Sequence, residues 1–113
     1  MKVRTEMHEE VPVVHLAGSL SMGGECQLLT DAVQKEFSAG RYRVVLELDG
    51  LQFVDSAGLG QIVALRRTAA EAGGALVLAG PRGKVRDILQ LTRLDQLILV
   101  RAGVAEAIEA VRS

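Results

Sequence analysis

The feature that most constrains the fold of this chain is a regular alternation between short apolar runs and longer stretches with helical periodicity. The run 11–20 is rich in Val and Leu, as expected of a buried strand. In the following stretch, Leu29, Val33 and Phe37 recur every four residues, which places them on one face of a helix. The pattern predicts strands over 2–8, 11–20, 44–48, 75–79 and 97–100, and helices beginning near residues 24, 56, 81 and 104.

This order of elements predicts an α/β fold with a mixed sheet. Only Glu9 and Glu10 separate the first two strands, so these strands are antiparallel. The later strands are joined through helices, which makes them parallel with right-handed crossovers. We therefore expect one domain over residues 1–113, with a mostly parallel sheet of four to five strands and about four helices, mainly on one face. The other face is expected to be thinly covered, as a surface that meets a partner would be.

Composition excludes several classes of function. The formal net charge is −1 and the charges are scattered, so nothing favours nucleic acid or anionic lipid as a partner. Cys26 is the single cysteine, which excludes an internal disulfide and a thiolate metal cluster. No His, Cys and acidic residues have metal-ligand spacing, and we expect no cofactor. The chain shows no signal peptide and no apolar run of about 18 residues, so we expect a cytoplasmic protein without membrane insertion.

The most informative segment is 49–60, which follows a buried strand as a loop and opens a helix. Ser56 is suited to cap that helix, with its hydroxyl accepting from N–H groups two or three residues later. Gly58 and Gly60 leave the first turn unshielded. Because a helix N-terminus favours negative charge, a phosphoryl group on Ser56 would lie near backbone N–H groups that can donate hydrogen bonds to it. On these residues alone, the more common interpretation is a serine that only caps a helix.

Enzymatic interpretations of the sequence fail on single positions. A hydrolase nucleophile elbow needs glycine two residues before the serine, where Val54 stands. Val63 occupies the place of the third glycine of a dinucleotide fingerprint, and Leu78 that of the first glycine of a P-loop. His8 and His15 precede the serine and fall in predicted strands, where histidine is typically a surface or hydrogen-bonded residue. We expect that the chain is not an enzyme.

The segment 48–60, Leu-Asp-Gly-Leu-Gln-Phe-Val-Asp-Ser-Ala-Gly-Leu-Gly, resembles the signature of the STAS domain family. More specifically, it resembles that of bacterial anti-sigma factor antagonists, in which an acidic residue precedes Ser, Ser or Ala, Gly, Leu and Gly. The resemblance extends to 16–20 (Leu-Ala-Gly-Ser-Leu) and to 81–94 in the third helix. The element order agrees with this family along nearly the whole chain, which implies a STAS-like fold.

The resemblance implies a partner switch. The unphosphorylated antagonist binds an anti-sigma factor that is a serine kinase with a histidine-kinase-like ATPase fold, and this frees the sigma factor. Phosphorylation of the serine after the Asp, here Ser56, breaks the complex, and Asp55 helps to shape the site. The implied partner-binding residues are Ser19, Ser21, Asp55, Ser56, Ala57, Gly58, Leu59 and Gly60.

Two positions depart from the family pattern. Ser21 stands in the partner-binding loop where the family usually has Asp, so it offers hydrogen bonds but no charge. Arg93 stands where a glycine often precedes the Leu near the end of the third helix. An alternative remains open, namely a STAS-fold binding subunit of a stress-signalling scaffold or of a lipid or anion transporter, without a serine switch. The sequence leaves the oligomeric state open.

A phosphate on Ser56 adds about −1.5 to −2 charges. The helix N-terminus attracts this charge and Asp55 repels it. We therefore expect no change of fold on phosphorylation, and an effect at the partner interface instead, where a desolvated dianion is costly.

Overall fold

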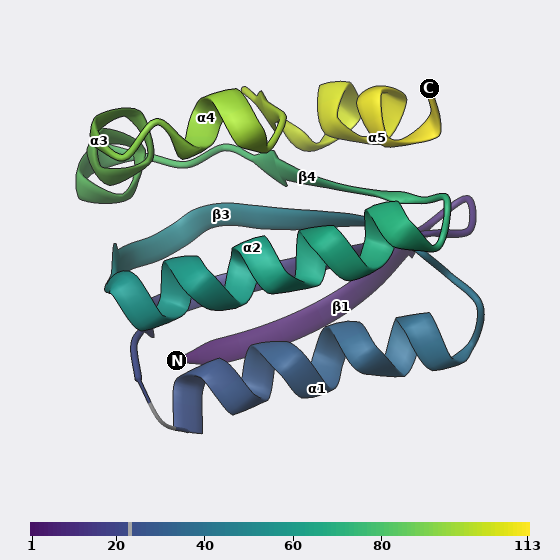
Figure 1. Ribbon diagram of the computed structural model, residues 1–113, viewed down its shortest axis with the longest axis horizontal. Coiled ribbons are helices and arrows are strands. Elements are labelled where there is room, and N and C mark those ends of the chain that lie inside the picture. Colours follow the sequence, from purple (N-terminus) through teal and green to yellow (C-terminus); the bar gives the residue numbers. More distant parts are fainter. Residues whose placement is uncertain (23) are drawn as a thin grey trace.

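The computed structural model describes residues 1–22 and 24–113, and its centre is one five-stranded sheet in the order β1-β2-β3-β4-β5 (Figure 1). The strands β1 and β2 are antiparallel, and each later pair of neighbours is parallel. The predicted mixed, mostly parallel α/β sheet is confirmed, with five strands. Their bounds are β1 (Lys2–His8), β2 (Val11–Leu20), β3 (Arg43–Val54), β4 (Ala75–Ala79) and β5 (Val100–Arg101).

The first two strands are joined by a two-residue turn, as predicted. Glu9 and Glu10 have φ angles of 49° and 73°, both in the left-handed region. Positive φ at both central residues characterises a type I′ turn, whose twist matches that of the flanking strands. Because two glutamates hold this conformation without glycine or asparagine, tertiary pairing along the whole of β1 must stabilise the turn.

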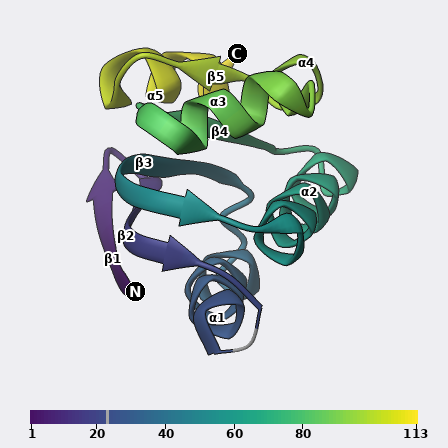
Figure 2. The same cartoon turned by 90° about the vertical axis from the view of Figure 1, so that its left-hand side faces the viewer.

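Helices lie on both faces of the sheet (Figure 2). Since neighbouring strand residues point to opposite faces, Val14 packs into the large core beneath α1, α2 and α3, whereas Val13 packs with α5 on the other side. The helix α5 follows the last strand and is not a crossover, so it is free to lie opposite the others. The prediction of helices mainly on one face is confirmed, with α5 as the exception. The helices are α1 (Gly24–Ser38), α2 (Ser56–Glu71), α3 (Gly83–Leu91), α4 (Leu94–Leu97) and α5 (Val104–Arg112).

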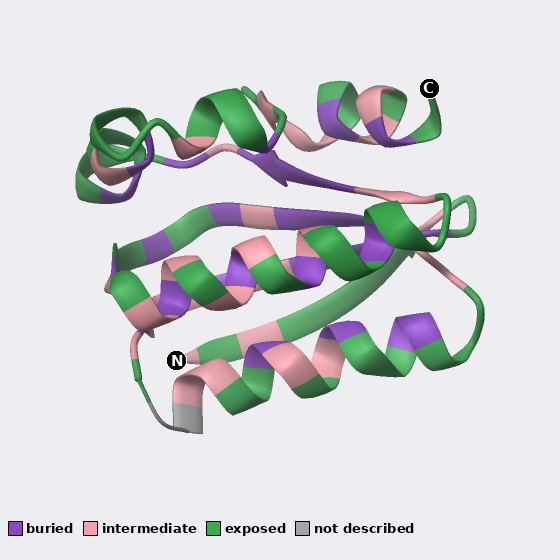
Figure 3. Ribbon diagram, viewed as in Figure 1, coloured by how far each residue is buried: buried purple, intermediate pink, exposed green. Residues whose placement is uncertain are grey.

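The face that carries α5 is only partly covered. The helix packs on β3 and β4, and β1 stays largely exposed at the edge of the sheet (Figure 3). Beside it the His15 ring lies 3.1 Å from Glu47 and 3.2 Å from Glu6, and so ties three strands together through polar contacts. Hydrogen bonds with His8 and His15 hold the pKa of Glu6 below its usual value. Both histidines are thus hydrogen-bonded strand residues.

The segment 49–55 was predicted to be a loop, and this prediction is wrong for most of it. The strand β3 continues to Val54, and its second half pairs with the end of β2 from Ala17↔Gly50 to Leu20↔Val54. The register shifts twice along this pair, once on each side of the Ala17↔Gly50 and Gly18↔Leu51 pairs, and at each shift β3 carries one more residue than β2. Local sequence indicated a loop because Asp49-Gly50 is typical of turns. Pairing with a ten-residue neighbour outweighs that preference.

The end of the chain also differs in detail from the prediction. The last strand was expected over 97–100, but β5 covers only Val100–Arg101. The short helix α4 occupies the preceding residues, and it had not been predicted. The third helix begins at Gly83 instead of Pro81. Boundaries of such short elements depend on neighbouring backbone more than on local pattern.

Replacing Arg93 by glycine is expected to stabilise the protein. Arg93 lies between α3 and α4 with φ 60° and ψ 22°, a left-handed conformation that costs a residue with a Cβ about 1–2 kcal/mol. Allowing for the greater freedom of glycine in the unfolded chain, Arg93→Gly should gain about 0.5–1 kcal/mol. Urea denaturation would show a higher midpoint at unchanged slope. Arg67→Gly, in the exposed middle of α2, is the matched control and should cost about 1 kcal/mol. Equal losses in both variants would contradict the conformational argument.

Candidate functional site

The signature segment and the predicted partner loop meet at the carboxyl ends of two adjacent parallel strands. Leu20 ends β2 opposite Val54, which ends β3, so the residues that follow each strand lie side by side. This brings Ser21 close to the start of α2, although 35 positions separate it from Ser56. Ligands and regulatory groups of open α/β sheets collect at this edge.

Asp55 connects these segments. One oxygen of its carboxylate accepts a hydrogen bond from the Gly58 N–H at 2.8 Å, and the other accepts from the Met22 N–H at 3.1 Å. Its own backbone N–H donates to the Leu20 carbonyl at 3.2 Å. Asp55 is therefore the N-cap of α2, and the prediction that Ser56 caps this helix is wrong. Asp55 caps the helix from one position earlier. Its carboxylate has two acceptor oxygens, so one of them can cap α2 while the other reaches the β2–α1 loop.

These contacts favour the ionised form of Asp55. Hydrogen bonds from the backbone of Gly58 and then of Met22 hold the pKa of the carboxyl below its usual value, although desolvation acts in the opposite direction. At neutral pH the start of α2 thus carries a fixed negative charge directly before Ser56.

Ser56 is the first residue of α2 and its side chain is exposed. Its hydroxyl forms no hydrogen bond with any described residue, so it is open to a reagent from solvent. The sequence suggested that a phosphoryl group here would find ready N–H donors. The structure revises this expectation, because the carboxylate of Asp55 already uses the Gly58 N–H.

The two glycines of the signature have different roles. Gly58 is buried against the end of β2, and a Cβ there would lie 2.6 Å from the Leu20 carbonyl oxygen. Gly60 is exposed, and a Cβ there would meet nothing within 4 Å. Only Gly58 is thus required for packing, and Gly60 leaves an open patch next to Ser56.

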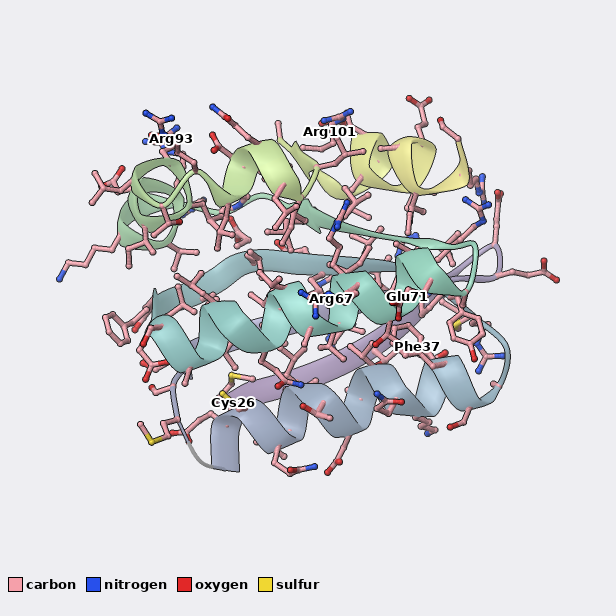
Figure 4. The ribbon with its side chains drawn as sticks, in the orientation of Figure 1. Cys26, Phe37, Arg67, Glu71, Arg93 and Arg101 are labelled. Carbon is pink, nitrogen blue, oxygen red and sulfur yellow. The ribbon has the colours of Figure 1, made fainter. Side chains whose placement is uncertain are left out.

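The remaining predicted partner residues lie around this point. Ser19, Ser21, Ala57 and Leu59 are all half-buried. The Ser21 carbonyl accepts a hydrogen bond from the Cys26 thiol at 3.0 Å. Burial, together with the negative charges of Asp55 and Glu25, raises the pKa of that thiol, which is the opposite of what a reactive cysteine needs (Figure 4).

Sequence reasoning missed two exposed apolar side chains at the same edge. Met22 is 76% exposed in the β2–α1 loop, and Phe53 is 43% exposed at the end of β3. One signal was available, since Phe53 is one of very few aromatic residues in an otherwise aliphatic protein and lies inside the signature. Exposed large apolar side chains gathered at one edge of a domain are typical of protein interfaces.

The described residues contain no group of three or more His, Cys, Asp or Glu side chains able to hold a metal ion. Within residues 1–22 and 24–113, no helix has the length and apolar character that crossing a membrane requires.

The contrast between the signature glycines gives a stability test. Gly58→Ala is expected to cost about 1–3 kcal/mol, because the new methyl group collides with the Leu20 carbonyl. Gly60→Ala is expected to gain about 0.5–1 kcal/mol, because alanine is the better helix former and the space is open. Chemical denaturation of both variants measures the two effects. Similar effects of the same sign would contradict the packing role of Gly58.

The charge of Asp55 gives a pH test. A carboxyl whose pKa is lower in the folded state stabilises the fold above its ordinary pKa of about 4, and this contribution is lost as the pH falls through the folded-state value. In Asp55→Asn the amide oxygen can still accept the hydrogen bond that caps the helix. The amide NH₂ group replaces the other oxygen and cannot accept from the second backbone N–H. The variant should be less stable than the parent at pH 7, and the two denaturation midpoints should converge in acid. A gap that persists at low pH would argue against the ionised clamp.

Comparison with known proteins identifies the family and the fold. The family model described as "Mlab, STAS domain" matches residues 3–101. A Thermotoga maritima protein assigned as an anti-sigma factor antagonist is 34% identical over 73 residues, which span 65% of this chain and 65% of that relative. Anti-sigma factor antagonists are non-enzymatic regulators, in agreement with the expectation that this chain is not an enzyme.

Solved structures show the same fold. The crystal structure of a Thermotoga maritima protein described as an anti-sigma factor antagonist has a TM-score of 0.88 at 27% identity. The alignment covers 98% of this chain and 95% of that one. The Bacillus cell fate determinant SpoIIAA in its phosphorylated form has a TM-score of 0.73 at 24% identity, over 98% of this chain and 100% of that one. With the family model matching most of its length and its fold shared along almost the entire chain, this protein belongs to the STAS family.

Proposed function

We propose that this protein is an anti-sigma factor antagonist whose activity is switched at Ser56. In its unphosphorylated form it binds an anti-sigma factor serine kinase and thereby releases the sigma factor, and phosphorylation of Ser56 reverses this. The observation that carries the proposal is an exposed serine directly after an ionised, structurally fixed aspartate at the start of α2. It acts in the cytoplasm, as a binding protein without a cofactor.

The surface around Ser56 suits a protein partner. Met22 and Phe53 offer exposed apolar area at the same edge of the sheet, and the half-buried Leu59 adds to it. Gly60 leaves the adjacent helix turn open to close approach. The fully buried centre of a protein interface is more apolar than its rim, and a few large side chains there carry most of the binding energy.

The same surface suggests how phosphate would switch binding. In the free protein a phosphate on Ser56 stays in water, but it lies beside the negative charge of Asp55, which already uses the nearest helix donor. The chain therefore offers the dianion little compensation of its own. In the complex the phosphate would be desolvated and close to Asp55, which weakens binding without requiring a change of fold.

The proposal is tested by measuring phosphorylation of this protein by the anti-sigma factor serine kinase of the same organism, and its binding to that kinase. Kinase and ATP should add one phosphate, which Ser56→Ala abolishes. Ser38→Ala, an exposed serine at the end of α1, is the matched control and should leave phosphorylation intact. Ser56→Asp should keep the fold and weaken kinase binding by about 2 kcal/mol or more, measured by calorimetry.

Two results would refute this assignment. One is a stable phosphate on Ser19, Ser21 or Thr92 with Ser56 unmodified. The other is a Ser56→Asp variant that binds the kinase as tightly as the parent, which would favour a STAS binding subunit without a serine switch.

A further inference from the structure

A second site is indicated by an uneven distribution of charge. The whole chain has a formal net charge of −1, but residues 80–101 carry five basic and only two acidic side chains, a local excess of three positive charges. All five basic side chains are exposed. Figure 4 shows two of them, Arg93 and Arg101, on the side of the molecule that carries α3, α4 and α5. The net charge of the chain therefore conceals a basic region.

Three of these basic residues, Arg82, Arg86 and Arg101, line a pocket of about 600 Å³ at the carboxyl ends of β4 and β5. The β4–α3 loop, the helix α3 and the loop after β5 form its walls. Its volume lies in the range of small-molecule sites, and the carboxyl edge of parallel strands is where such sites occur. Ser56 and the residues around it do not line this pocket.

The polar lining of the pocket is incompletely paired. The Arg82 guanidinium lies 3.1 Å from the Asp49 carboxylate, so these two charges offset each other. Arg86 and Arg101 also line the pocket, and neither forms an ion pair with any described residue. Arg101 donates one hydrogen bond to the neighbouring Val100 carbonyl at 3.1 Å. Because a guanidinium has five N–H donors, most of the donor capacity of this pair remains available.

The other polar groups narrow the class of ligand. Asp95 and Gln90 line the same pocket and accept hydrogen bonds, so a simple anion would meet one repulsive carboxylate. A ligand with hydroxyl groups next to its anionic group would satisfy both kinds of partner. The lining contains no aromatic side chain on which a nucleotide base would stack.

We propose that this pocket binds a small polyol oxyanion, with its phosphate or carboxylate held by Arg86 and Arg101 and its hydroxyl groups by Asp95 and Gln90. The proposal does not depend on the serine switch. It gives the protein a metabolite site on the same edge of the sheet as Ser56, built from different strands.

Titration at constant ionic strength tests the proposal, with ribose 5-phosphate and citrate as probes of the two kinds of oxyanion and ribose as the uncharged control. Saturable shifts of the Arg86 and Arg101 side-chain N–H signals in NMR spectra are expected with at least one anion, and none with ribose. The double variant Arg86→Gln/Arg101→Gln should raise the Kd at least tenfold. Arg67→Gln, an exposed arginine of α2 outside the pocket, should leave the Kd unchanged (Figure 4).

The variants also separate this proposal from the serine switch, because the double variant should keep the unfolding midpoint and the phosphorylation of Ser56. A lower unfolding midpoint or a loss of Ser56 phosphorylation would show that the double variant has a damaged fold. The single variants Arg86→Gln and Arg101→Gln would then decide, and the proposal requires that they raise the Kd while keeping the midpoint of the parent. Two results would overturn the proposal: no saturable binding of either anion, or an unchanged Kd in the arginine variants.

Discussion

The carboxylate of Asp55 accepts hydrogen bonds from two backbone segments that are far apart in sequence, and the arrangement of the candidate site depends on it. It caps α2 through Gly58, holds the β2–α1 loop through Met22, and follows directly on the last residue of β3. Gly58 must lack a side chain because α2 starts against the Leu20 carbonyl. The acidic residue and the glycine of the signature are therefore both required to position the exposed serine between them.

This edge rests on a core that is almost entirely aliphatic. Central strands pack on both faces, so that Val13 and Val14, neighbours in β2, belong to different clusters. The smaller cluster exists because α5 returns across the sheet after the last strand. The uncovered part of that face is not apolar, since His15 bridges glutamates of β1 and β3 there. The apolar surface exposed near Ser56 is thus a local feature, and the thinly covered face is closed by polar contacts.

The carboxyl edge of the sheet carries two surfaces of opposite character. The ends of β2 and β3 present Ser56 beside a negative charge and two apolar side chains. The ends of β4 and β5 present unpaired guanidiniums around a pocket. The ion pair between Arg82 and Asp49 joins the β4–α3 loop to β3. In parallel sheets every strand delivers its following loop to this edge, which explains how so small a domain can hold both surfaces.

The element order, the antiparallel first pair of strands and the start of a helix at the serine could be predicted from the sequence, because they follow from hydrophobic periodicity and short connections. That residues 49–54 continue the strand depends on tertiary structure. The Asp-Gly pair by itself favours a turn, and pairing with the end of β2 outweighs this local preference. The tertiary structure also determines how Asp55 is held as the cap of α2, because the second hydrogen bond to its carboxylate comes from Met22, 33 positions away. The side of the sheet taken by α5, the left-handed turn at Arg93 and the gathering of arginines around a pocket likewise depend on contacts between distant segments, which no local pattern records.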